Sequence, residues 1–242
     1  MKTVTNTEII ESRAKWAKRI APLTMLFLIG GLITNFMSIN QPEYFRPTMI
    51  LLALGFVLAI VSSYLTNRWV REPRSDQILT NMLKKFSNDF ILFNYTTSPA
   101  HILLTPCCLY VIVVKQHDGN ITVNGHRFSR GFSWKLIFRY FADEGVGAPV
   151  TEAESGVNKL AKQLSKELAP EEIPEIKPLI LFSNKDVQLT ITNPPPVPLL
   201  QSHEFKAYLR EQTKNKNISA SQRKTLAQII GGQWAELQKI GG

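Results

Sequence analysis

The sequence predicts an α/β protein in which two N-terminal transmembrane helices precede an α/β sandwich with a mixed sheet. Three observations predict this class: two long uncharged stretches near the N-terminus, a buried hairpin of strands near the middle, and alternating strand-like and helix-like segments after it. The 242 residues are enough for one ordinary domain and an anchor. We expect the anchor over residues 1–74, the domain over 75–212, and a linker with an amphipathic helix over 213–242.

The anchor consists of two predicted membrane-spanning helices, at about residues 20–40 and 47–67. Both stretches are uncharged and rich in large apolar residues, and each has the roughly 20 residues that a bilayer-crossing helix needs. A cleaved signal peptide and a buried helical hairpin of a soluble protein are the alternatives. The presence of a second long apolar stretch argues against both.

Basic residues predict the orientation of this anchor. Seven cations flank the two spans on the side of the chain termini: Arg13, Lys15, Lys18, Arg19, Arg68, Arg71 and Arg74. The turn at residues 38–46 holds one Arg and one Glu. Positive residues favour the cytoplasmic side, so we expect an integral protein of the inner or plasma membrane with both termini in the cytoplasm. These cations also account for much of the net charge of +9, which is therefore weak evidence for nucleic-acid binding.

The elements of the domain follow from apolar periodicity and from capping and turn residues. The first helix would be capped by Ser75 or Asp76, the helix that starts at 151 by Thr151, and the last helix by Ser219 or Ser221. An Asp118-Gly119 turn should follow the hairpin. The expected helices are 75–86, 133–141, 151–168, 202–209 and 219–237, and the expected strands are 90–95, 101–104, 109–114, 122–128, 178–182 and 188–191.

The hairpin at residues 100–121 organises the predicted sheet. Its two strands are nearly continuous runs of β-branched and large apolar residues, which is typical of strands covered on both faces. Lys115 closes the second strand, where a buried sheet first meets water. Cys107 and Cys108 are adjacent, so they form neither a spaced disulfide framework nor a CxxC metal pattern. We expect packed thiols in a reducing compartment, with a disulfide or redox role as the alternative.

The same hairpin resembles the nuclease-related domain (NERD) family, a branch of the restriction-endonuclease-like nucleases. Seven residues match the family pattern over 99–121 without a gap: His101, Pro106, Tyr110, Ile112, Lys115, Gly119 and Ile121. The resemblance continues more weakly over about 75–210. It implies a restriction-endonuclease-like fold for the domain.

Two departures from the family pattern concern its metal site. In the family, an Asp on the first strand and a Glu two residues before the Lys bind a divalent metal, and the Lys helps to position the attacking water. This sequence has Ala100 and Val113 at the two acidic positions, and only Lys115 remains. Mg²⁺ prefers oxygen ligands, so we expect no metal or other cofactor and a catalytically degenerate domain. Lys115 is then either a remnant anion-binding group or a strand-end lysine.

A rearranged acidic site is the alternative. Asp76, Asp89 and Asp118 would supply its ligands, and the protein would then be an active Mg²⁺-dependent nuclease or phosphodiesterase. His101 and His117 lie near Lys115 in the sequence and are candidate ligand-binding residues. Ordinary structural roles compete with these: a cap for Asp76, a turn for Asp118 and a hydrogen-bonded core position for His101.

Four basic residues interleaved with aromatic ones form the last candidate site: Arg127, Arg130, Lys135 and Arg139. Such a cluster can bind the phosphates of nucleic acid or the headgroups of anionic lipids, or it can be the solvated side of a helix. No nucleotide-binding, zinc-protease or serine-hydrolase motif is present. The sequence thus favours a membrane-anchored module that binds or scaffolds, with the lipid bilayer and possible nucleic acid or lipid headgroups as partners.

Overall fold

The computed structural model describes residues 1–131, 145–214 and 217–234. The helix expected over 133–141 lies outside these residues. The chain forms two compact units, described separately below. The first contains Met1–Asn6, Ser75–Gly131 and the described residues from Val146 onward, and the described part of the second is Thr7–Arg74 with Gly145.

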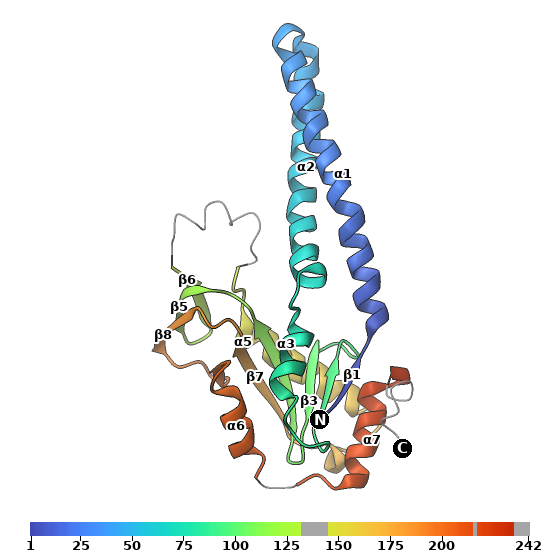
Figure 1. The fold of residues 1–242 in the computed structure, drawn as a ribbon, viewed down its shortest axis with the longest axis vertical. Coiled ribbons are helices and arrows are strands. Elements are labelled where there is room, and N and C mark those ends of the chain that lie inside the picture. The colour runs from blue at the N-terminus through green and yellow to red at the C-terminus, as the bar shows by residue number, and fades with distance from the viewer. Residues whose placement is uncertain (132–144, 215–216, 235–242) are drawn as a thin grey trace. The chain divides into compact units, whose positions relative to one another are not determined.

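A six-stranded mixed sheet is the centre of the first unit (Figure 1). Its strands, in spatial order, are β1 (Lys2–Thr5), β2 (Ile91–Asn94), β3 (His101–Leu104), β4 (Leu109–Lys115), β7 (Ile176–Phe182) and β9 (Leu199–Gln201). The β2–β3 and β3–β4 pairs are antiparallel, and the β1–β2, β4–β7 and β7–β9 pairs are parallel. This arrangement confirms the predicted α/β class with a mixed sheet. The edge strand β1 had no counterpart among the predicted elements.

A second, three-stranded sheet continues from the central pair of strands. It contains β6 (Arg127–Arg130), β5 (Gly119–Asn124) and β8 (Val187–Asn193) in that spatial order. Here β5 pairs in parallel with β8, just as β4 pairs with β7. The residues Asp118-Gly119 therefore do not fold the chain back onto β4, as a hairpin turn would. Gly119 has a φ of 76°, which suits glycine, and the chain passes there into the second sheet.

Helices cover both faces of the central sheet. They are α3 (Ser75–Leu83), α5 (Pro149–Leu164), α6 (Phe205–Gln212) and α7 (Ala220–Gly231). Alternate residues of each strand point to opposite faces. One core cluster joins Val111 of β4 to Leu160 of α5 and Leu226 of α7. The other joins Tyr110 of β4 to α3 and α6, so the layers are helix, sheet, helix.

The ends of two helices test the predicted caps. Ser219 is the N-cap of α7 and its hydroxyl accepts a hydrogen bond from the Gln222 backbone amide, as predicted. The prediction for α5 was wrong: the helix begins at Pro149 with Ala148 as N-cap, and Thr151 lies inside the first turn. Proline suits the first helical position because its fixed φ matches the helix and no amide is lost there.

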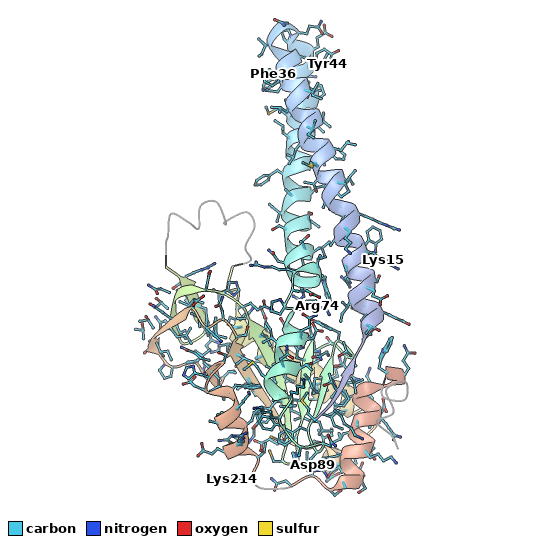
Figure 2. All side chains as sticks on the ribbon, in the orientation of Figure 1. Lys15, Phe36, Tyr44, Arg74, Asp89 and Lys214 are labelled. Atoms are coloured by element: carbon cyan, nitrogen blue, oxygen red, sulfur yellow. The ribbon has the colours of Figure 1, made fainter. Side chains whose placement is uncertain are left out.

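The second unit is a hairpin of two long apolar helices. These are α1 (Thr7–Asn40) and α2 (Phe45–Leu65), joined by a short 3-10 helix (Pro42–Tyr44), with a π-helical turn (Thr66–Val70) after α2. Figure 2 labels Phe36 and Tyr44 at the turn end of this hairpin and Lys15 and Arg74 at its other end. Both helices are long and apolar enough to cross a membrane, although length and composition alone are weak evidence.

Small residues allow the two helices to approach closely. Gly31 meets Leu52, and Gly55 meets Leu28, so each glycine receives a leucine of the opposite helix. The buried residues of α1 recur every seven positions: Ile10, Ala17, Thr24 and Gly31. A seven-residue repeat is the pattern of a coiled-coil seam. Most large side chains outside this seam are exposed, which is the arrangement expected of helices that contact lipid.

We predict that Gly156→Val destabilises the first unit. A Cβ atom at Gly156 would lie 2.7 Å from Cγ1 of Val111, a buried β-branched residue that has little freedom to move. Overpacking of this kind costs about 1–3 kcal/mol. Denaturant titration of the detergent-solubilised chain should show a lower unfolding midpoint. Asn158→Val, at an exposed position of the same helix, is the matched control, and an equal loss there would contradict the packing explanation.

Candidate functional site

The candidate site lies where β4 ends. Within β4, Val111, Val113 and Lys115 share the face covered by α5, whereas Tyr110 and Ile112 point to the face of α3 and α6. Lys115 is the last residue of the strand, and its carbonyl accepts a hydrogen bond from the Ser183 amide after β7. Carboxyl ends of parallel strands are where open α/β sheets commonly place ligands. Lys115 therefore stands at a position suited to a binding site.

A carboxylate that was not predicted faces Lys115. The Lys115 ammonium donates to both oxygens of Glu152, at 2.9 Å each, and Glu152 lies in the first turn of α5. The lysine side chain is 12% exposed and the glutamate side chain 50% exposed. Because the carboxylate is half in water, the ion pair is worth about 1 kcal/mol or less. Its main effect is to give the nearly buried Lys115 ammonium a carboxylate partner.

Val113, one of the two positions that are acidic in the family pattern, faces the same side of the sheet as Lys115. It packs against the cluster that contains Val150 and Ala153 of α5. Ala100, the other position, lies just before β3, and the pairing of β3 with β4 ends at Ile102 with Val111. Both positions hold apolar side chains.

These residues do not fit a divalent metal. A hard cation needs several oxygen ligands, and Ala100 and Val113 supply none. Glu152 is the carboxylate at Lys115, and it already binds the ammonium group. Within residues 1–131, 145–214 and 217–234, no three His, Cys, Asp or Glu side chains gather in a way that could hold a metal ion.

The three aspartates of the alternative site do not meet at Lys115. Asp118 pairs with Arg130 of β6. Asp89 pairs with Arg223 of α7 at 3.1 Å. Asp89 precedes β2 at the end of the sheet where β4 begins with Leu109. Lys115 lies six residues further along β4, so Asp89 and Lys115 are about 20 Å or more apart.

Asp76 is placed differently from the other two aspartates. It is buried in the first turn of α3, and its neighbour Ser75 accepts a hydrogen bond from Gln116. Gln116 follows Lys115 and points to the opposite face of the sheet, because successive residues of a strand alternate. Asp76 therefore lies on the α3 side, while Glu152 lies on the α5 side. The sheet separates the two carboxylates.

The two predicted histidines also lie apart. His101 is buried, its Nδ1 is 2.9 Å from the side-chain oxygen of Asn94, and its ring packs edge-on against Tyr95. Leu103, two residues after His101 in β3, faces α3. Residues two apart in a strand share a face, so His101 also faces α3 and points away from Glu152. His117 follows β4 in the connection to the second sheet. The structure does not bring His101 and Lys115 to a common face.

The described part of the basic cluster does not form one patch. Arg127 and Arg130 lie at positions of opposite facing on β6. Arg127 is exposed, whereas Arg130 is ion-paired with Asp118. Between them, Phe128 stacks on Phe182. Lys135 and Arg139 lie outside the described residues, so the cluster as a whole stays a prediction.

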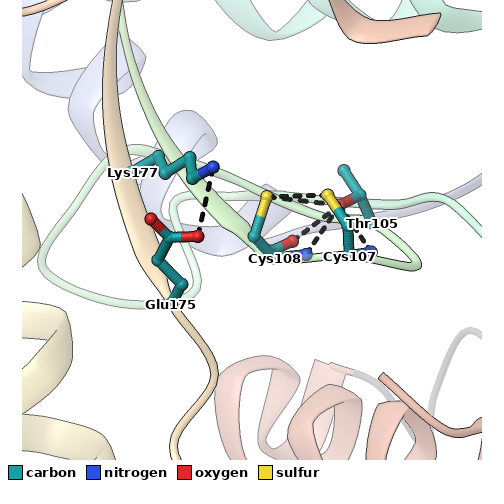
Figure 3. A network of polar contacts seen from close by, with 5 residues as sticks. All are labelled: Thr105, Cys107, Cys108, Glu175 and Lys177. Atoms are coloured by element: carbon teal, nitrogen blue, oxygen red, sulfur yellow. Dashed lines mark hydrogen bonds and ion pairs between the residues drawn. The ribbon is translucent and has the colours of Figure 1, made fainter. Parts of the chain in front are cut away.

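Cys107 and Cys108 lie in the turn between β3 and β4 and are free and buried. Their sulfur atoms are 2.9 Å apart, and both contact the hydroxyl of Thr105 (Figure 3). That hydroxyl also donates to the Cys108 carbonyl, so it closes the turn. Beside this turn, Lys177 pairs with Glu175 at 3.1 Å. Packed thiols are what the sequence predicted.

Burial controls the titration of this turn. It raises the pKa of Cys108 from its ordinary value of 9.0 to about 12, with the neighbouring Cys107 adding to the rise. Burial also raises the pKa of Tyr110. The hydrogen bond to Glu175 raises the pKa of Lys177. Because the thiolate is the reactive form of cysteine, Cys108 is an unreactive thiol in the folded chain.

Glu152 is the residue of the site that sequence reasoning missed. The sequence placed it only in the first turn of the helix expected over 151–168. An acidic residue in the first turn of an amphipathic helix was the available signal, since that turn favours negative charge. Nothing local identified the strand end on which the turn packs.

The fold is an α/β domain with Lys115 at the end of a central strand. The two positions that are acidic in the family pattern hold the apolar residues Ala100 and Val113. Residues 64–183 match the family model of the nuclease-related domain. This match confirms the family resemblance that the hairpin pattern predicted. A search of curated proteins and a search of solved structures found no significant match.

We predict that the folded chain loses stability as the pH rises from about 8 to 9.5. In this range the Cys108 thiol ionises in the unfolded chain but keeps its proton in the folded chain. The unfolded state then binds fewer protons, so the free energy of unfolding falls with pH, by at most about 1.4 kcal/mol per pH unit. Cys108→Ala should flatten this slope when urea midpoints are measured across the range. An unchanged slope would contradict the raised pKa.

Proposed function

We propose that this protein is a membrane-anchored cytoplasmic nuclease-related domain that has lost metal-dependent hydrolysis and acts by binding or scaffolding. The family match gives the nuclease-related ancestry, and a restriction-endonuclease-like fold follows from it as part of the proposal. The observation that carries the loss of hydrolysis is the state of Lys115. Its ammonium is bound by Glu152, and the neighbouring acidic positions hold Ala100 and Val113.

Physical chemistry supports the loss of hydrolysis. A metal nuclease needs carboxylates that hold the ion and a lysine that is available to the attacking water. Here Val113 and Ala100 sit where that charge would be needed, and they cannot compensate a dication. A lysine bound at 2.9 Å to both oxygens of a carboxylate already has a partner. Glu152 is the carboxylate at Lys115 where the family pattern has two, and it neutralises the charge of the lysine.

Membrane anchoring has its own support. Both helices of the hairpin expose large apolar side chains along most of their circumference. Water would make this exposure costly, at about 25 cal/mol for each Å² of apolar surface, whereas lipid would not. The strand β1 precedes the hairpin and belongs to the same sheet as the residues that follow it. Because β1 and β2 pair in one sheet, the chain must begin and resume on the same side of the membrane, and two spans achieve this.

The ligand we propose is anionic: nucleic acid or a phosphate-bearing headgroup. Support comes from the exposed Arg127 on β6 and, for a lipid headgroup, from the seven cations that flank the two spans. The inner or plasma membrane is the proposed location, with both termini in the cytoplasm, because the cations concentrate on the side of the termini.

We predict that the purified full-length chain does not cut DNA or RNA with Mg²⁺ or Mn²⁺. The full chain is the right sample, because removing residues 1–74 would also remove β1 from the sheet. Product formation should equal that of Lys115→Ala on gels run beside an authentic metal nuclease. Robust cleavage by the unmodified chain that disappears in Lys115→Ala would overturn the proposal. Loss of that cleavage in Glu152→Gln as well would identify Glu152 as a relocated catalytic carboxylate.

Restoring the two carboxylates should restore metal binding. We predict that Ala100→Asp with Val113→Glu lowers the melting temperature without metal, because two carboxylates beside apolar side chains repel and lose hydration. Mn²⁺ should then raise the melting temperature by about 2–4 °C for each kcal/mol of binding free energy. The unmodified chain should show no such shift. Absence of a metal-induced shift in the double variant would mean that the two positions do not face one site.

The proposed orientation of the anchor predicts which introduced cysteines can be labelled from outside the cell. A cysteine introduced at Gln41, in the turn between the helices, should react with a membrane-impermeant maleimide added outside intact cells. A cysteine placed at Gly242 should react only after the membrane is opened. Both variants would be made in a Cys107→Ala, Cys108→Ala background. The reverse pattern would refute the proposed orientation, and equal labelling at both sites would refute the double span.

A further inference from the structure

A tryptophan with two guanidinium groups over its ring lies at the base of the helical hairpin. Trp69 is 7% exposed and belongs to the π-helical turn that follows α2. The guanidinium carbon of Arg68 lies 5.7 Å from the ring centroid, and that of Arg13 lies 6.0 Å away. Both distances are within reach of cation–π attraction, with which an indole holds a guanidinium better than a phenyl ring does.

The two arginines come from different helices, and the register of the hairpin brings them together. Gly31 meets Leu52 and Leu28 meets Gly55, so positions earlier in α1 face positions later in α2. Arg13 accordingly meets the residues just after α2. The Nη1 atom of Arg68 donates to the Tyr64 hydroxyl at 3.3 Å, which fixes this side chain further.

Neither guanidinium group is used in an ion pair among the residues that the structure describes. Both arginines are exposed, although the indole that holds them is buried. The nearby Glu72 pairs with Arg74. The two planar cations are thus held in place, and apart from the Nη1 group of Arg68 that donates to Tyr64, their N–H donors remain available for a ligand.

Their position along the hairpin identifies the kind of ligand. Trp69 lies two residues beyond Asn67, where the uncharged stretch of the second span ends. Arg13 precedes the uncharged stretch of the first span, which starts at Ile20. Given the proposed membrane anchoring, on which this inference rests, both guanidinium groups lie at the cytoplasmic headgroup level. Anionic lipids are enriched there, and tryptophan favours the same level.

We propose that Arg13 and Arg68, held over Trp69, bind the phosphate of an anionic phospholipid headgroup. A guanidinium group presents a rigid fork of N–H donors that matches two phosphate oxygens. The indole holds both forks before the lipid arrives, so less side-chain entropy is lost on binding. The site therefore selects anionic lipid over zwitterionic lipid by geometry as well as by charge.

The test uses the full-length protein in micelles that contain phosphatidylcholine and phosphatidylglycerol. Native mass spectrometry counts the lipids that stay bound. The wild-type chain should retain phosphatidylglycerol in preference to phosphatidylcholine. Each cation at an anionic membrane surface is worth about a fivefold change in affinity, so Arg13→Gln with Arg68→Gln should weaken retention by about 25-fold.

Two matched controls separate a built site from general basic charge. Lys15→Gln removes a cation near Arg13 in the sequence that is not one of the two cations over the Trp69 ring, and Arg46→Gln removes the cation near the turn of the hairpin. Both variants should keep the preference for phosphatidylglycerol. A loss in Lys15→Gln equal to that of the double variant would overturn the proposal, because any basic residue would then suffice.

Two further outcomes are decisive. Inorganic phosphate in excess should not displace the bound lipid; if it does, the ligand is free phosphate and the lipid assignment is wrong. Equal retention of the two lipids by the wild-type chain would also overturn the inference. Alkaline carbonate extraction of cell membranes tests the anchor separately. A chain released by carbonate refutes the anchoring itself, whereas a chain that stays embedded without lipid preference refutes only the lipid site.

Discussion

The parallel pairing of β4 with β7 is the constraint on which the rest of the first unit depends. Seven residue pairs hold the two strands together, from Leu109 with Ile176 to Lys115 with Phe182. Because this pair is covered on both faces, strand alternation decides which helix each side chain meets. It sends Val113 and Lys115 toward α5, and it sends Tyr110 toward α3 and α6. It also determines that the chain continues into a second parallel pair, β5 with β8.

With the proposed loss of hydrolysis, the site at the end of this pair keeps the architecture of the domain without the metal chemistry of the family. Val113 packs against the α5 cluster, and neither Val113 nor Ala100 adds a buried charge. The remaining lysine would be costly without a partner, since its side chain is only 12% exposed. Glu152 supplies that partner from the helix above. Metal-dependent catalysis would need carboxylates at positions 100 and 113, whereas packing beside α5 favours apolar side chains. This sequence has the apolar side chains.

The sequence predicted those features that depend on local pattern. The runs at 101–104 and 109–114 could be identified as buried strands because their apolar residues are nearly continuous, and Ser219 was recognisable as a cap. Features that depend on distant partners were not predictable. The strand β1 has only four residues, Lys2–Thr5, and no turn residues beside it mark a strand. It is a strand because it pairs with β2, which is distant in the sequence. Glu152 became part of the site only through the packing of α5 on β4.

The position of β1 at the start of the chain bears on how this protein is made. Lys2 pairs with Ile91, and both helices of the hairpin lie between them in the sequence. A ribosome therefore releases the first strand of the sheet well before its partner exists. During that interval the strand has no backbone hydrogen-bond partners of its own sheet, while the two apolar helices emerge. Closure of so long a segment slows folding more than it weakens the final structure. With the proposed anchoring, insertion of the hairpin therefore precedes completion of the sheet, and until β1 pairs the edge of β2 is open to other chains.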